Sequence, residues 1–271
     1  MEKDKVINNH KKNGSRDFYN LGHQRIELKK VDALLAPIMI IGSPRSGTTW
    51  LQRLLLENKL IAGGQESFFY SLFNESFLSV KDDIGGRRVG LSAYWEKDQF
   101  NMQMQELWVR TFLPMFLNKP SATVLLEKTP FHAFYLDDIA DFLPNTKFIH
   151  LIRDSRAVTA SLNAAAKGWG GGWAPKNTKK SALEWYRHVK AVRNSKASKN
   201  NQVYLEVHYE DLLLEPSEEL KRIFTFIEKT SSMTLSNYDK EKVSNSFASF
   251  LLDENNINSP YSDSISTFIM K

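Results

Sequence analysis

The chain lacks cysteine, and its N-terminal region lacks any apolar run of the signal-peptide or membrane-spanning kind. Without cysteine, disulfides and thiolate metal sites are excluded, and a reducing compartment is favoured. The longest apolar stretch near the N-terminus, residues 33–41, contains Pro37 and is much too short to span a bilayer. We therefore expect a cytoplasmic protein that does not insert into membranes.

The charge balance is modestly basic and evenly spread. The 36 Lys and Arg residues against 31 Asp and Glu give a net charge of +5. The lysines form no stripe, so we expect no nucleic-acid partner, while the excess suits an anionic ligand. The length of 271 residues allows one large domain. We place it at residues 31–230, after a polar N-terminal extension (1–30) and before a divergent, partly disordered C-terminal segment (231–271).

A phosphate-binding loop is present without its usual lysine. The segment Gly42-Ser43-Pro44-Arg45-Ser46-Gly47-Thr48-Thr49 keeps the glycine frame of nucleotide-binding loops, but threonine stands where that lysine reaches the β and γ phosphates of ATP. Its only cation is Arg45. The loop therefore indicates an anion other than the ATP triphosphate.

The surroundings of the loop favour an anion site. Residues 37–41 predict a buried strand and residues 48–58 a helix, so the loop lies at a helix N-terminus. Unpaired N–H groups and the positive end of the helix dipole attract phosphate there. Ser46, Thr48 and Thr49 add hydroxyl donors. The alternative is a glycine-serine turn that binds nothing.

Three segments in order resemble the sulfotransferases, which take a sulfuryl group from 3′-phosphoadenosine 5′-phosphosulfate (PAPS). Residues 44–51 are similar to their 5′-phosphosulfate loop. A predicted strand, 147–152, leads into Arg153, with Ser161 eight positions later, as in the family's 3′-phosphate site. A Tyr-Glu-Asp-Leu stretch begins at Tyr209, after a predicted strand at 203–207. The resemblance implies donor contacts from Arg45, Ser46, Gly47, Thr48, Thr49, Trp50, Arg153, Ser161 and Tyr209.

The resemblance also indicates a catalytic base. Glu127-Lys128-Thr129-Pro130 has proline where the cytosolic branch of the family carries its histidine base, so the chain looks closer to the tyrosylprotein and bacterial branch. That branch uses a glutamate, which Glu66 matches here. Phe68, Phe69 and Tyr70 follow Glu66 and are expected to make its surroundings apolar. His132 is the alternative base, and Lys128 joins Arg45 in meeting developing negative charge.

The predicted fold is α/β, a P-loop-like three-layer sandwich with a central parallel sheet flanked by helices. Strands and helices alternate, as such a sheet requires. Beyond the segments already named, we predict a strand at 124–126 and helices at 96–118, 131–142, 156–166, 182–193 and 215–228.

Two segments stand apart from this pattern. Residues 167–173 are rich in glycine and carry Trp169 and Trp173, which indicates either a mobile lid over donor or acceptor, or a flexible surface loop. Residues 230–271 lack the basic, glycine-containing segment that family members place after the last helix. Either the donor site closes differently here or the chain is truncated relative to its relatives.

The sequence as a whole predicts a PAPS-dependent sulfotransferase. We expect transfer to a hydroxyl or amine of a small-molecule or peptide acceptor, release of adenosine 3′,5′-bisphosphate (PAP), and no metal. The alternatives are an ATP-dependent P-loop kinase and a non-catalytic protein that binds PAPS or PAP.

Overall fold

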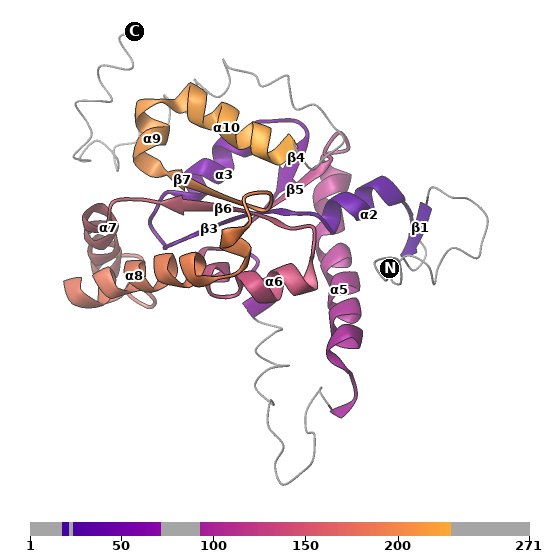
Figure 1. Cartoon of the computed structure of the whole chain (residues 1–271), viewed down its shortest axis with the longest axis horizontal. Coiled ribbons are helices and arrows are strands. Elements are labelled where there is room, and N and C mark those ends of the chain that lie inside the picture. Colours follow the sequence, from indigo (N-terminus) through magenta and orange to yellow (C-terminus); the bar gives the residue numbers. More distant parts are fainter. Residues whose placement is uncertain (1–17, 22–23, 72–92, 229–271) are drawn as a thin grey trace.

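A parallel sheet of five strands forms the centre of the computed structural model, which describes residues 18–21, 24–71 and 93–228. The spatial order is β4-β5-β3-β6-β7 (Figure 1). Their bounds are β3 (Ile38–Gly42), β4 (Ile61–Gly63), β5 (Val124–Lys128), β6 (Lys147–Ile152) and β7 (Tyr204–His208). The expected segment 231–271 lies outside the described residues, as do residues 1–17.

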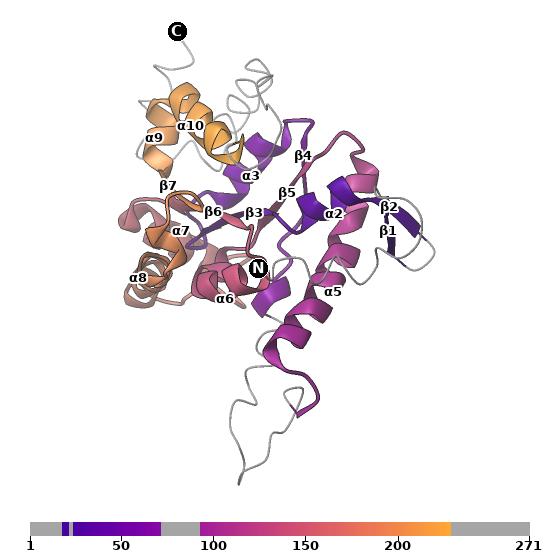
Figure 2. The ribbon, with the colours of Figure 1, turned by 45° about the vertical axis from the view of Figure 1, so that its right-hand side comes forward.

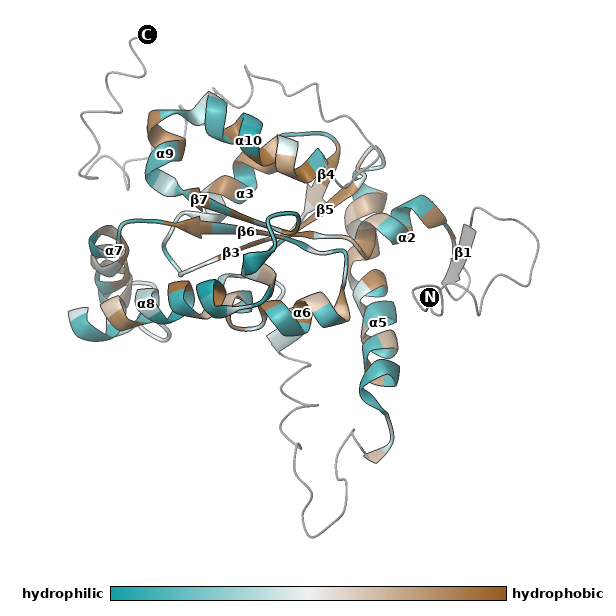
Figure 3. Ribbon diagram, in the orientation of Figure 1, coloured by the Kyte–Doolittle hydropathy of each residue, from teal (hydrophilic) through white to brown (hydrophobic). Residues whose placement is uncertain are grey.

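The central strands are apolar because both of their faces are covered. Every residue of β3, β5 and β6 is buried, as expected for a parallel sheet between two helical layers. Figure 3 colours these strands by hydropathy, and much of the central sheet is brown, that is, hydrophobic. Alternate side chains of β3 point to opposite layers, with Ile38 and Ile40 in one hydrophobic cluster and Met39 and Ile41 in the other.

Helices cover both faces of the sheet, which confirms the predicted three-layer α/β sandwich (Figures 1 and 2). One layer holds α3 (Thr48–Leu56), α9 (Tyr209–Leu214) and α10 (Pro216–Glu228). The other holds α6 (Leu136–Phe142), α7 (Ser155–Lys167) and α8 (Thr178–Asn194). At the β4–β5 end lie α5 (Lys97–Asn118) and α2 (Leu28–Leu34), which pack against each other. No helix of the described residues is long and apolar enough to cross a membrane.

Local sequence signals explain several helix starts. The Asp154 carboxylate accepts from the backbone N–H groups of Arg156 and Ala157 and begins α7, and Asn177 accepts from the N–H of Lys180 and begins α8. Pro216 opens α10, where its missing N–H costs nothing.

The structure corrects one predicted helix and adds elements that were not predicted. Residues 131–142 form a 3-10 turn, η2 (Pro130–Phe134), followed by α6, because the backbone leaves helical geometry at Tyr135, with φ −130° and ψ 20°. The buried side chain of His132 holds η2 through a hydrogen bond to Glu127. The additional elements are the short strand β4, the 3-10 turn η3 (Ala197–Lys199), helices α2 and α9, and a hairpin of β1 (Phe18–Leu21) and β2 (Gln24–Glu27). The expected boundary at residue 30 falls inside α2.

Candidate active site

The predicted site residues gather at the edge of the sheet where all five parallel strands end. β3 lies between β5 and β6, so the chain leaves β3 towards β4 on one side and later returns to β6 on the other. Ligands of open α/β sheets bind at such reversals of strand order, beyond the carboxyl ends of the strands. The loop of residues 43–47 lies at this point.

The loop needs both of its glycines. Gly47 has φ 94°, and a Cβ atom added there would lie 2.6 Å from the ring of Tyr209. Gly42 has φ 154°, and its added Cβ would lie 2.4 Å from the carbonyl oxygen of Leu151. Between them Arg45 has φ 72°, a left-handed conformation that is uncommon for a residue with a side chain. The backbone is therefore strained at Arg45, the cation of the loop.

Arg45 and Ser161, predicted from separate motifs, are in direct contact. The Nε of Arg45 donates to the Oγ of Ser161 at 2.9 Å, and the guanidinium lies 5.4 Å from the ring centre of Trp169. Partial burial, and secondly the positive charge of Arg153, lower the pKa of Arg45 from its usual value. Two cations brought together in this way favour an anion beside them.

The second predicted arginine also points into this region. Arg153 follows β6 directly, and its guanidinium lies 4.4 Å from the ring centre of Tyr209. Its Nε is buried without a hydrogen-bond partner among the described residues, and the same holds for the Oγ of Ser46. Buried donors are normally satisfied, so these two atoms at the strand ends are available to donate to an anionic ligand there.

Lys128 joins the loop to the predicted base. Its Nζ donates to the Oγ1 of Thr49 at 3.1 Å and to the Oε1 of Glu66 at 2.5 Å. The Lys128 side chain is 5% exposed, whereas the Glu66 side chain is 35% exposed. The lysine is thus fixed by both contacts, and the carboxylate remains partly open to solvent.

The remaining predicted residues lie deeper. Thr48 and Trp50 are buried on α3, and the ring of Trp50 meets that of Tyr209 edge-on at 5.2 Å. The expectation that Phe69 and Tyr70 surround Glu66 is wrong, because both rings are buried in the core and pack against Phe142. Only Phe68 keeps its ring exposed.

His132 is poorly placed to act as the base. Its side chain is fully buried, and its Nδ1 lies 3.1 Å from the Oε2 of Glu127. Glu127, Thr129 and the partly exposed Ser67 form a hydrogen-bond network with it that sequence reasoning did not assign. No local signal singles out Ser67, because its partners lie 60 and 62 positions later in the chain.

The glycine-rich segment lies against the loop arginine. Trp169 is 72% exposed and packs on Trp173, with ring centres 5.4 Å apart. A cleft of about 430 Å³ opens next to this segment, lined by Asn163, Ala166, Lys167, Lys176, Asn177 and Thr178. The lid function of residues 167–173 stays a prediction. Residues 18–21, 24–71 and 93–228 contain no cluster of three His, Asp or Glu side chains that could hold a metal ion.

Proteins named as protein-tyrosine sulfotransferases resemble the chain in sequence. A putative protein-tyrosine sulfotransferase of Caenorhabditis briggsae is 28% identical over 198 residues, which cover 70% of this chain and 65% of the relative. Another, from Caenorhabditis elegans, is 30% identical over 143 residues, covering 50% of this chain and 54% of the relative. The chain therefore spans about half to two thirds of the length of these relatives.

Solved structures and a family model agree with this likeness. The sulfotransferase domain from the curacin biosynthetic pathway superposes with a TM-score of 0.51 at 19% identity, covering 71% of this chain and 74% of that one. Mouse sulfotransferase SULT7A1, complexed with PAP, gives 0.50 at 14% identity, covering 87% and 77%. At such identities the likeness establishes the fold. The model of the sulfotransferase family matches residues 37–231, and the chain therefore belongs to the sulfotransferase family.

Proposed function

We propose that the chain transfers a sulfuryl group from PAPS to a hydroxyl or amine acceptor and releases PAP. The observation that carries this proposal is the position of Lys128, whose Nζ contacts both Thr49 of the phosphate loop and the carboxylate of Glu66. A single cation thereby connects the anion site with the group suited to accept a proton. Family membership supports the same reaction.

The residues at the strand ends fit the donor. The loop N–H groups, Ser46 and Arg45 would hold the 5′-phosphosulfate, since the Oγ of Ser46 is buried without a partner in the described structure. Arg153 and Ser161 would hold the 3′-phosphate, because the Nε of Arg153 is equally unpaired there. When bound, PAPS supplies a sulfuryl group attached to a phosphate leaving group.

Glu66 is the proposed general base. Its carboxylate is the accessible acid beside the loop, and it would take the proton from the acceptor at Oε1 or Oε2 as the acceptor attacks. Lys128 and Arg45 would meet the negative charge that develops on transfer, and each such contact contributes up to a few kcal/mol, on the order of the loss of one oxyanion-hole donor. Positioning of the two substrates supplies the rest.

The acceptor class follows from the relatives rather than from the site. The curated relatives are named protein-tyrosine sulfotransferases, so a tyrosine-containing peptide is the first acceptor to test. A small phenol, 4-nitrophenol, tests the same chemistry without the peptide.

Transfer of ³⁵S from labelled PAPS to these two acceptors tests the proposal. We expect transfer by the wild-type chain, a loss of at least about 100-fold in Glu66→Ala, and unchanged PAP binding, because a general base contributes about 10²–10⁴-fold. The matched control is Glu106→Ala, which removes an exposed glutamate paired with Arg110. Binding of PAP without any transfer would contradict the proposal that the chain is an enzyme and would favour a non-catalytic protein that binds PAP.

A further inference from the structure

Three consecutive residues at the end of β5, Glu127, Lys128 and Thr129, make hydrogen bonds to residues 66–68. Lys128 donates to the carboxylate of Glu66 at 2.5 Å. The Oγ1 of Thr129 accepts from the backbone N–H groups of Ser67 and Phe68, at 3.1 and 3.3 Å. The Oε1 of Glu127 accepts from the Oγ of Ser67 at 2.8 Å. The segment that carries the proposed base is therefore fixed by a strand about 60 residues away.

Glu127 is an unusual residue to find at this position. Its side chain is 1% exposed, and strand alternation turns it away from Lys128, towards η2. It accepts from Ser67, from the Oγ1 of Thr129 at 2.6 Å and from the Nδ1 of His132 at 3.1 Å. Burying a carboxylate is unfavourable unless several donors surround it, and here three side chains do.

The electrostatics agree with an ionised Glu127. Burial raises the pKa of its carboxyl group, but the charge of His132 and the hydrogen bonds from His132, Thr129 and Ser67 outweigh that effect and hold the pKa below its usual value. An ionised acceptor makes the stronger hydrogen bonds to Ser67 and Thr129.

The backbone of residues 66–68 is also strained, at Phe68. Phe68 has φ 51°, a left-handed conformation that bulky residues rarely adopt and that persists only where the surroundings impose it. The N–H of Phe68 bonds to Thr129, and its half-exposed ring lies 6.4 Å from that of Phe131. Such strain next to a proposed base indicates a conformation kept for function.

We propose that Glu127 is a positioning residue for Glu66, acting through Ser67 and Thr129; this inference rests on the proposed function. Ser67 directly follows Glu66, so fixing the Ser67 backbone and hydroxyl fixes the point from which the Glu66 side chain starts. Lys128 then draws the carboxylate towards Thr49 of the loop. Without the Glu127 contacts, the exposed Glu66 would sample positions away from the acceptor.

Amide hydrogen exchange tests whether Glu127 fixes the segment that carries Glu66, and it needs no turnover. Glu127→Gln is expected to raise exchange across residues 66–69 at least about tenfold, and Ser67→Ala, at a partly exposed position, provides a second variant if the first folds poorly. The control is Glu206→Gln, which alters a carboxylate bonded to Arg193 and Tyr204 on β7, remote from β5 in the sheet. Unchanged exchange at 66–69 in both test variants would overturn the inference.

Kinetics test whether the position of Glu66 set by Glu127 matters for turnover. With ³⁵S-labelled PAPS and 4-nitrophenol or the tyrosine peptide, Glu127→Gln is expected to lower kcat about 10–100-fold while PAP affinity stays within about twofold. Added to Glu66→Ala, it should cause no further loss of the residual turnover, because its effect passes through Glu66. A further loss in that background, or a parallel fall in PAP binding, would show a general structural role and overturn the inference.

The exchange and kinetic measurements together distinguish a failure of this inference from a failure of the proposed function. If the wild-type chain gives no transfer, the proposed function fails, and the exchange measurement still decides whether Glu127 holds the segment. If Glu66→Ala abolishes transfer while Glu127→Gln leaves kcat unchanged, the proposed function stands and the positioning inference fails.

Discussion

At the scale of single residues, the candidate donor site is marked by buried donors without partners in the described chain. The Oγ of Ser46 and the Nε of Arg153 are both in this state, on loops that follow neighbouring strands. Leaving a donor unsatisfied costs free energy, and an anion bound there would recover that cost. Stability and ligand affinity should therefore respond to these residues in opposite ways.

Replacing Ser46 with alanine tests this opposition. Ser46→Ala removes a buried hydroxyl that has no partner in the described structure, so we expect the free energy of unfolding to stay unchanged or rise by up to about 1 kcal/mol. PAP affinity should fall about tenfold, the value of one lost hydrogen bond to a charged ligand. Urea unfolding and calorimetry measure the two quantities. A large loss of stability with intact PAP binding would assign Ser46 to packing.

Gly47 is a second position at which a small substitution should change stability, because the added Cβ atom would clash with Tyr209. A Cβ there would lie 2.6 Å from the Tyr209 ring at φ 94°, so Gly47→Ala should destabilise the fold by about 1–3 kcal/mol and weaken PAP binding. Gly172→Ala is the matched control, since nothing lies within 4 Å of its added Cβ. Equal unfolding midpoints for the two variants would refute the close approach of Tyr209 to the loop.

The sequence predicts the identity of many site residues but not their contacts. Arg45 and Ser161 follow from motifs, yet their hydrogen bond joins positions 116 residues apart. The role of Ser67 depends on Glu127 and Thr129, which only the fold brings to it. Conversely, proximity in sequence misleads for Phe69 and Tyr70, whose rings turn into the core instead of towards Glu66.

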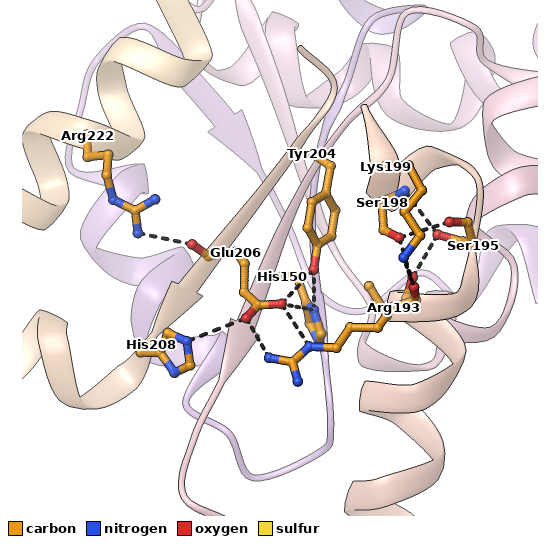
Figure 4. Close-up of polar contacts among 10 residues, drawn as sticks. His150, Arg193, Ser195, Ser198, Lys199, Tyr204, Glu206, His208 and Arg222 are labelled. Carbon is orange, nitrogen blue, oxygen red and sulfur yellow. Dashed lines mark hydrogen bonds and ion pairs between the residues drawn. The ribbon is translucent and has the colours of Figure 1, made fainter. Parts of the chain in front are cut away.

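At the scale of elements, a polar network fastens α8 to the edge strand β7 (Figure 4). The guanidinium of Arg193, on α8, makes two hydrogen bonds to Glu206, on β7, at 2.6 and 3.1 Å. The hydroxyl of Tyr204 bonds to Glu206 and to the Nδ1 of His150, on β6. These contacts hold the last strand of the sheet beside Tyr209, which follows it.

His150 makes stability depend on pH. Burial is the main cause that lowers its pKa from 6.5 to about 3, with Arg193, His208 and His188 adding to it and Glu206 opposing it. Below pH 6.5 the unfolded chain binds a proton that the folded chain does not, so stability falls as pH falls from 6.5 towards 3.

This linkage is measurable by urea unfolding at pH 7.5 and pH 5. We expect His150 to account for about 2 kcal/mol of the loss of unfolding free energy at pH 5, at about 1.4 kcal/mol per unit of pKa shift, and His150→Asn to show a correspondingly smaller difference. Burial also lowers the pKa of His188, which adds a loss of the same sign in both proteins. The same pH dependence in His150→Asn would show that other groups cause it.

The elements differ in how well the sequence predicts them. The strand β3 is a continuous apolar run, and β5 and β6 are mostly apolar, with Glu127 and Lys128 in one and Lys147 and His150 in the other; all three lie where the sequence predicts strands. The helix predicted at 131–142 is broken at Tyr135, where the backbone has φ −130° and ψ 20°, so a 3-10 turn precedes α6. The strand β4 has only three residues, too few to give a pattern.

At the scale of the whole molecule, strand order explains why the motifs converge. β3 has β5 on one side and β6 on the other, so the loop after β3, Lys128 at the end of β5 and Arg153 after β6 meet at one edge (Figure 1). Nothing in the spacing of these motifs fixes that order. The cytoplasmic location stays a prediction.

The central claim is that this edge binds a 3′-phosphorylated adenosine nucleotide. Calorimetric titration of the full chain with PAP, and with ATP and magnesium for comparison, tests it most directly. Arg156→Ala is the matched control for Arg153→Ala, because Arg156 is 88% exposed and pairs with Asp154. We predict micromolar PAP binding, much weaker ATP binding, and a loss of at least about 100-fold in Arg153→Ala alone, as expected for removing a bidentate arginine from a phosphate. Tight ATP binding with no response to PAP would contradict the account.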